Sequence, residues 1–208
     1  MAKHQNSVGS LVLHRIQGAE PGWVFAPVDF SDLGSRDAVA TSLKRYKATG
    51  TVRQLARGLY DVPRTHPKVG PVVPSVESVA EAIKRRDSVR LQPTGAYAAN
   101  LLGLSDQVPL RVVFLTDGLQ RRIRLGNLEI LLKRTTPRNM ATAGRVSGSV
   151  IQALRWLGRR NVTEGTVRHL RGLLDPEARR SVLSDLRYAP VWIAEIMRRI
   201  AEPRASLQ

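Results

Sequence analysis

The sequence predicts an α+β protein, with an N-terminal winged helix-turn-helix followed by a mixed domain that has a small antiparallel sheet and C-terminal helices. Three observations lead to this fold class. Three short helical patterns and a small hairpin fill residues 1–63, a proline-rich stretch spans 64–74, and a buried strand, a second hairpin and further helices fill 75–208. With 208 residues, the chain is long enough for two small domains.

Spacing of apolar residues predicts the first two helices. Apolar side chains recur at helical intervals from Ser7 to Ile16, and Gly18 offers a stop. Trp23 to Phe25 is predicted to be extended. Pro27 then opens a second helix of about two turns that Gly34 closes.

The third helix is the best defined of the three. Ser35 can cap it through its hydroxyl, and Gly50 ends it. Val39, Leu43 and Tyr46 fall at i, i+4 and i+7, so they form one buried stripe. The opposite side is polar and basic.

Two β-prone segments, 52–55 and 59–62, follow this helix, and Gly58 relieves the turn between them. Three short helices followed by a hairpin are typical of a winged helix-turn-helix, in which the third helix enters the major groove and the hairpin lies along the DNA backbone. The candidate DNA-binding residues are Arg36, Thr41, Lys44, Arg45, Arg53 and Arg57. An ordinary solvated helix face and a protein-docking module are the alternatives for this segment.

Residues 64–74 carry several prolines and are predicted to form an extended domain linker. Beyond it, Leu110 to Thr116 is predicted to be a fully buried strand, and Gly126-Asn127 is a strong two-residue turn signal inside a hairpin over 123–132. Helices are predicted over 75–86, 95–102, 141–157, 163–174, 176–187 and 189–201.

Charge favours a polyanionic partner. The chain has 33 Lys and Arg against 17 Asp and Glu, a net charge of +16, and a pI near 11.4. Because the excess grows along the chain and is not confined to one helix, double-stranded nucleic acid is favoured over a membrane surface.

Several classes of protein are disfavoured. The chain has no Cys, no long apolar run and no signal peptide, which fits a cytoplasmic protein. His4, His14, His66 and His169 lack metal-ligand spacing, and no nucleotide-binding or hydrolase motif occurs. We therefore expect no enzyme activity, no cofactor and no metal site.

Three stretches resemble the AbiEi-type antitoxins of bacterial abortive-infection systems: Leu55 to Tyr60, Leu91 to Leu104, and Leu115 to Gly118. The resemblance implies a repressor whose winged helix binds inverted repeats in its own promoter. It also implies that the C-terminal domain, 75–208, is an antitoxin domain that counters a nucleotidyltransferase-like toxin. In such a type IV toxin-antitoxin system the two proteins need not form a stable complex.

Two other readings stay open. A sequence-independent nucleic-acid protein, acting on RNA or DNA, would explain the charge without a promoter. A metal-dependent nuclease could use Asp106 and Asp117, which bracket the predicted strand, although Asp117-Gly118 is equally a turn signal.

Overall fold

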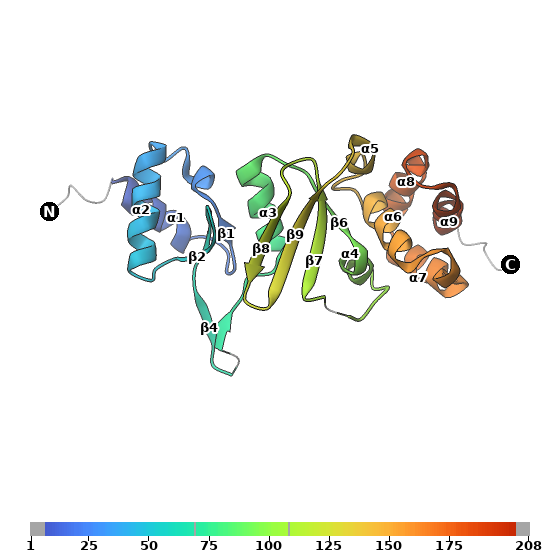
Figure 1. The fold of residues 1–208 in the computed structure, drawn as a ribbon, viewed down its shortest axis with the longest axis horizontal. Helices are drawn as coiled ribbons and strands as arrows, with labels where there is room; N and C mark the ends of the chain where they lie inside the picture. The colour runs from blue at the N-terminus through green and yellow to red at the C-terminus, as the bar shows by residue number, and fades with distance from the viewer. Residues whose placement is uncertain (1–6, 69, 108, 203–208) are drawn as a thin grey trace. The chain divides into compact units, whose positions relative to one another are not determined.

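A computed structural model gives the fold and describes residues 7–68, 70–107 and 109–202 (Figure 1). His4 and the ends of the two predicted domains, 1–6 and 203–208, lie outside the described residues. The chain divides into two compact units. The first comprises residues 1–89 with 123–127, and the second comprises 90–122 with 128–208.

The first unit begins with the predicted winged helix-turn-helix. Its elements follow in the order α1 (Val8–Gln17), β1 (Val24–Phe25), the 3-10 helix η1 (Pro27–Phe30), α2 (Arg36–Ala48), β2 (Arg53–Ala56) and β3 (Leu59–Asp61). The three strands form an antiparallel sheet in the order β1-β3-β2. The predicted order of elements is confirmed, but the second helix is one 3-10 turn and not two turns.

Aromatic packing fixes this short second helix. The rings of Phe25 and Phe30 meet edge to face with centroids 5.5 Å apart, and Trp23 lies 4.8 Å from Phe25. Phe25 and Phe30 are fully buried. One 3-10 turn is enough to place Phe30 in this cluster, so the chain leaves the helix there and turns toward α2.

The predicted proline-rich linker has a different local structure. Residues 64–74 contain the strands β4 (Arg64–His66) and β5 (Gly70–Val72), which pair as an antiparallel hairpin. The helix α3 (Val76–Asp87) follows within the same compact unit. Prolines are tolerated at hairpin edges as well as in extended linkers, so proline content alone did not separate the two structures.

The second sheet is mixed, and the expectation of an antiparallel sheet was wrong. Its strands are β6 (Leu91–Thr94), β7 (Arg111–Thr116), β8 (Arg121–Leu125) and β9 (Leu128–Arg134), in the order β6-β7-β9-β8. β7 and β9 run parallel, with Val112 opposite Ile130 and Phe114 opposite Leu132. Only alternate residues of β7 are buried, so the prediction that this strand is fully buried was wrong. β6, which pairs antiparallel with β7, was not predicted.

Strand composition explains why β9 lies inside the sheet. Ile130, Leu131 and Leu132 are buried in succession, so both faces of β9 are covered. β8 instead alternates arginines with buried Ile123 and Leu125, and charged strands are suited to a sheet edge. The predicted turn at Gly126-Asn127 joins these two strands.

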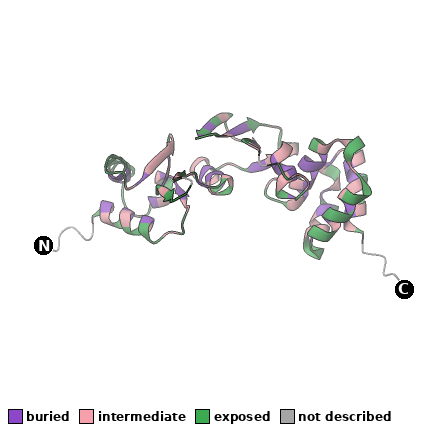
Figure 2. Cartoon of the chain, turned by 90° about the horizontal axis from the view of Figure 1, so that it is seen from below, coloured by how far each residue is buried: buried purple, intermediate pink, exposed green. Residues whose placement is uncertain are grey.

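Helices make up most of the C-terminal part of the chain. They are α4 (Gly95–Leu101), α5 (Pro137–Met140), α6 (Val146–Leu157), η2 (Arg159–Asn161), α7 (Glu164–Leu173), α8 (Pro176–Ser184), η3 (Leu186–Tyr188) and α9 (Val191–Ala201). The helices α4, α6, α7, α8 and α9 share one apolar core, in which Leu154, Leu170, Ile193 and Met197 are fully buried. Figure 2 shows buried and exposed residues on the same helices, as expected for amphipathic helices that share a core.

A tight contact at Gly148 holds α6 in place. A Cβ atom at Gly148 would collide with Gln92 Oε1 and with the carbonyl oxygen of Thr142. Beside it, the buried Ser147 hydroxyl donates a hydrogen bond to the Asp185 carboxylate. The same carboxylate forms an ion pair with Arg145, whose Nη1 lies 2.9 Å from Asp185 Oδ1. The predicted helix over 141–157 begins five residues later, at Val146, because Gly144 has a φ of +81°, which no right-handed helix contains.

None of the described helices approaches the length of about 20 apolar residues that a membrane crossing requires.

Gly148→Ala should destabilise the protein by about 1–3 kcal/mol, because the added methyl group overpacks a closed contact against backbone. Gly172→Ala is the matched control. Gly172 lies in α7 with no atom within 4 Å of the added Cβ, so alanine there should be neutral or should stabilise by about 0.5–1 kcal/mol. Urea denaturation followed by circular dichroism measures both. Equal stabilities of the two variants would contradict the close packing at Gly148.

Candidate nucleic-acid interface

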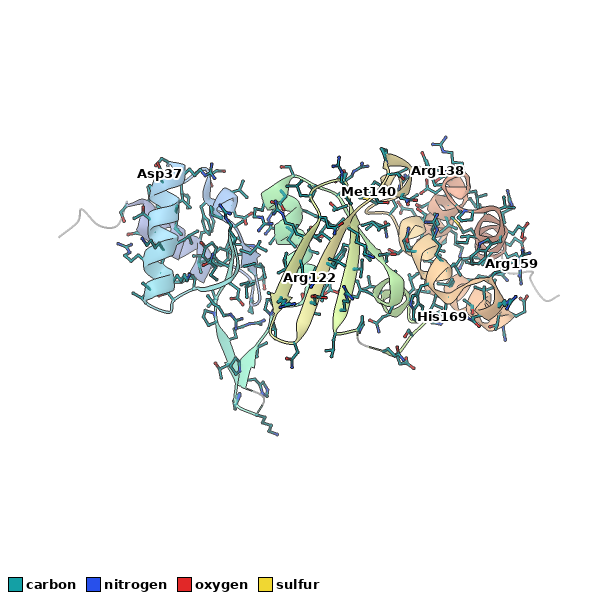
Figure 3. The ribbon with its side chains drawn as sticks, in the orientation of Figure 1. Asp37, Arg122, Arg138, Met140, Arg159 and His169 are labelled. Carbon is teal, nitrogen blue, oxygen red and sulfur yellow. The ribbon has the colours of Figure 1, made fainter. Side chains whose placement is uncertain are left out.

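The exposed face of α2 is basic. Arg36, Thr41 and Lys44 are all exposed, while Val39, Leu43 and Tyr46 on the opposite face are buried. Among the described residues, no ion pair engages Arg36 or Lys44. Asp37, which Figure 3 labels, lies in the first turn, where its carboxylate complements the positive end of the helix dipole.

Local capping defines where this face begins. The Ser35 hydroxyl accepts a hydrogen bond of 3.3 Å from the backbone N–H of Ala38, so Arg36 is the first helical residue. Arg36 and Lys44 are eight residues apart, which separates them by about 12 Å along the helix axis. The helix with its side chains is about 10–12 Å across, which fits the DNA major groove, about 12 Å wide.

Arg45, predicted to bind DNA, has its guanidinium engaged by the neighbouring Tyr46. Its Nη2 donates a hydrogen bond of 3.1 Å to the Tyr46 hydroxyl, and its guanidinium lies 5.1 Å from the centre of the Tyr46 ring. Tyr46 in turn donates to the carbonyl oxygen of Gly9 in α1 at 2.8 Å. Arg45 therefore helps to join α1 to α2, although the residue as a whole is exposed.

Arg57 lies at the tip of the turn between β2 and β3. It is exposed, and the following Gly58 has a φ of +69°, which glycine adopts without strain. The carbonyl oxygen of Arg57 accepts a hydrogen bond of 2.7 Å from Arg86 Nη1. The backbone of this turn is thus held from α3, while the Arg57 side chain stays on the surface.

Arg53 has a structural role instead of the predicted place on the wing surface. Its Nε and Nη2 bind the two carboxylate oxygens of Asp61 at 3.0 and 2.6 Å, and Nη2 also donates to the carbonyl oxygen of Val72 at 2.9 Å. The Asp61 side chain is 4% exposed. The hydrogen bonds that Arg53 donates to the Asp61 carboxylate raise the pKa of Arg53, with burial acting in the opposite direction.

Two arginines that the sequence analysis did not single out for the site brace it from α3. Arg85 binds Asp29 of η1 at 2.7 Å and donates to the carbonyl oxygen of Val24 at 2.9 Å. Arg86 binds Asp87 at 2.8 Å and the wing turn as described. Their position in the last turn of α3 suggested only compensation of the helix dipole, and no signal in the sequence pointed to η1 or the wing.

A hollow of about 460 Å³ lies beside these elements within the first unit. Its lining includes Arg36 from the first turn of α2, Gly58 from the wing turn, Arg86 from α3 and Val28 from η1. The first turn of α2 and the wing therefore border the same hollow. A ligand that spans helix and wing would meet both surfaces.

Two exposed carboxylates are held by arginine. The hydrogen bond from Arg15 lowers the pKa of Asp32 to about 2. Burial would raise the pKa of Asp117, but the Arg90 side chain and backbone N–H, both 2.9 Å away, lower it below its ordinary value. Asp117 thus anchors Arg90.

Among the residues that the structure describes, no three His, Asp or Glu side chains gather into a possible metal site.

Fold and surface together define an α+β protein with an N-terminal winged helix-turn-helix that presents a basic helix face. The chain belongs to the family described as a family of unknown function (DUF6088), whose model matches residues 11–182. Neither the curated proteins nor the solved structures contain a match to it.

Arg53→Leu should lower the free energy of unfolding by about 1–3 kcal/mol, because it leaves the Asp61 carboxylate buried without its partner. The salt dependence of DNA binding should stay unchanged. Adding Asp61→Asn to Arg53→Leu should restore part of the stability, because the unpaired charge is then absent. Thermal melts and binding titrations at several salt concentrations measure the two effects. A lower salt slope with unchanged stability would instead place Arg53 on DNA phosphates.

Proposed function

We propose that this protein is a DNA-binding transcriptional autorepressor that recognises inverted repeats in its own promoter. The observation that carries the proposal is the exposed face of α2, where Arg36, Thr41 and Lys44 are presented by a winged helix-turn-helix. Neither Arg36 nor Lys44 forms an ion pair with any residue that the structure describes. Such a helix can enter the major groove, where Arg and Lys donate hydrogen bonds to guanine and Thr contacts either base type.

The roles divide between base edges and phosphates. Lys44 and Thr41 lie near the middle of α2, so we assign them to base edges, and Arg36 lies at the helix start beside the wing. Arg57, at the tip of the wing turn, would contact the phosphate backbone. Arg45 would support the α1–α2 contact as well as approach the DNA, because its guanidinium rests on Tyr46.

We further propose that the protein is a cytoplasmic antitoxin of the AbiE type that counters a nucleotidyltransferase-like toxin without a required stable complex. Support comes from the three sequence stretches that resemble AbiEi-type antitoxins. Two of them form defined elements: Leu55 to Tyr60 makes the wing, and Leu91 to Leu104 spans β6 and α4.

A sequence-independent nucleic-acid-binding protein is the alternative function. The net charge of +16, spread along the chain, favours it, because counterion release from phosphates requires no particular base sequence.

Lys44→Ala should weaken binding to the promoter duplex by about 1–3 kcal/mol and relax base preference at one position, because a base contact is lost. Arg57→Ala should weaken all duplexes alike and lower the salt slope by about one, because a phosphate contact is lost. Fluorescence anisotropy measures both.

Lys84→Ala is the matched control, since Lys84 lies on α3 and binds Glu81 at 2.6 Å. It should leave promoter preference unchanged. If Lys44→Ala and Lys84→Ala had the same small effect on every duplex, α2 would not read the DNA sequence.

The antitoxin role predicts that a neighbouring reading frame encoding a nucleotidyltransferase-like protein arrests growth when expressed alone. Co-expression of this chain should restore growth, including with a Lys44→Ala variant that represses less. The reason is that the resemblance assigns neutralisation to the C-terminal domain, 75–208, whereas Lys44 lies in the winged helix-turn-helix. Growth arrest that persists with normal amounts of both proteins would contradict the antitoxin role and leave promoter binding intact.

A further inference from the structure

The end of α6 lies in an unusually basic part of the sequence. No Asp or Glu occurs from Ile130 to Thr163, a stretch of 34 residues that contains seven Lys and Arg. Three of these arginines, Arg155, Arg159 and Arg160, flank Trp156 within six residues. This segment, 155–160, belongs to the second unit and is separate from the winged helix.

The backbone of this segment is well fixed. The N–H of Gly158 donates to the carbonyl oxygen of Leu154 at 3.0 Å and closes α6. The 3-10 turn η2 follows. The backbone N–H of Asn161 donates to the carbonyl oxygen of Gly158 at 3.0 Å, and the Asn161 side-chain amide donates to the carbonyl oxygen of Leu157 at 2.7 Å. Both ends of the turn are therefore held, so the side chains between them start from a defined position.

Its side chains face solvent. Trp156 is 43% exposed, although Leu154 of the same helix is fully buried. Arg155, Arg159 and Arg160 are exposed, and no described residue makes an ion pair or a hydrogen bond with their side chains. Figure 3 labels Arg159 among the C-terminal helices.

Compensation of the helix dipole explains only part of this arrangement. Cations near a helix C-terminus are stabilising, but the effect falls off within the last turn, and Arg155 already occupies that position. It also does not explain the exposed indole of Trp156, which is not part of the adjacent apolar core. Indole and guanidinium groups on one surface are instead the combination that binds unstacked bases and their phosphates.

We propose that residues 155–160 form a binding site for single-stranded nucleic acid, in which a base stacks on Trp156 and the three arginines bind the adjacent phosphates. Consecutive Cα atoms are 3.8 Å apart, so the Cα atoms of Trp156 and Arg159 lie at most about 11 Å from each other. Both side chains are exposed, so they can serve neighbouring nucleotides. A single strand is favoured over a duplex, because duplex bases are already stacked on one another and do not offer a face to an indole. The site is independent of promoter recognition by α2.

The test is a binding titration of the full-length protein with a labelled oligothymidylate of about 12 nucleotides, within the usual site size of single-strand binders. Trp156→Leu should weaken binding by about five- to hundredfold, the range seen when a stacking aromatic is removed, whereas Trp156→Phe should retain most of the affinity because it keeps an aromatic face. The double variant Arg159→Gln and Arg160→Gln should lower the salt slope by about 1.4.

Controls separate this site from folding and from promoter binding. Arg180→Gln, an exposed arginine of α8, should change the salt slope for oligothymidylate little. Circular dichroism melts verify that Trp156→Leu is folded, and binding to the promoter duplex, which is assigned to α2, should survive in that variant. Polyglutamate serves as a polyanion without bases.

Equal affinity of wild type, Trp156→Leu and Trp156→Phe for oligothymidylate would overturn the proposal. So would polyglutamate binding with the same dependence on Trp156, which would indicate an acidic protein partner instead. Weaker promoter binding in Lys44→Ala with oligothymidylate binding unchanged would support two separate sites.

Discussion

Burial of one face of α2 is the constraint on which the nucleic-acid interface depends. Leu43 and Val39 pack into the apolar core of the winged helix, and Tyr46 binds Gly9 of α1 through its hydroxyl. Each large apolar side chain buried in this way contributes about 1.5–3 kcal/mol. Rotation of α2 about its axis would expose this stripe, so the helix has one stable orientation. Arg36 and Lys44 face solvent because the stripe faces the core.

Arginines in the first unit perform two different tasks. Some are engaged in ion pairs that join elements distant in sequence: Arg53 joins β2 to β3 and β5, and Arg85 joins α3 to η1. Others, such as Arg36 and Arg57, keep their side chains on the surface. The net charge therefore overstates the number of cations that can contact a polyanion. The positions of the carboxylates and carbonyl oxygens in the fold decide which arginines remain available to bind one.

Local patterns were sufficient to predict most elements of the fold. Ser35 as a cap, the stripe of Val39, Leu43 and Tyr46, and the turn at Gly126-Asn127 are signals that act within a few residues, and each appears in the structure as expected. Strand order was not predictable in this way. The insertion of β9 between β7 and β8 depends on which strand gains most from burial on both faces, which is a property of the whole sheet.

The candidate site residues likewise divide into those that local sequence patterns predict and those whose contacts depend on the whole fold. The exposed positions of Arg36, Thr41, Lys44 and Arg57 follow from helical periodicity and from the turn. The engagement of Arg53 by Asp61 and Val72, and that of Arg45 by Tyr46, depend on neighbours brought close by folding. Arg86 reaches the wing across 29 residues of sequence, a contact that no local pattern reveals.

The most direct measurement is a fluorescence-anisotropy titration of the protein against duplex DNA from upstream of its own gene and against a scrambled duplex of equal length, each at two salt concentrations. If α2 reads base edges, the upstream duplex binds at least about 10³-fold more tightly, the lower limit for sequence-specific proteins. Equal affinities for the two duplexes, both falling steeply with salt, would contradict promoter recognition and identify a general polyanion-binding surface.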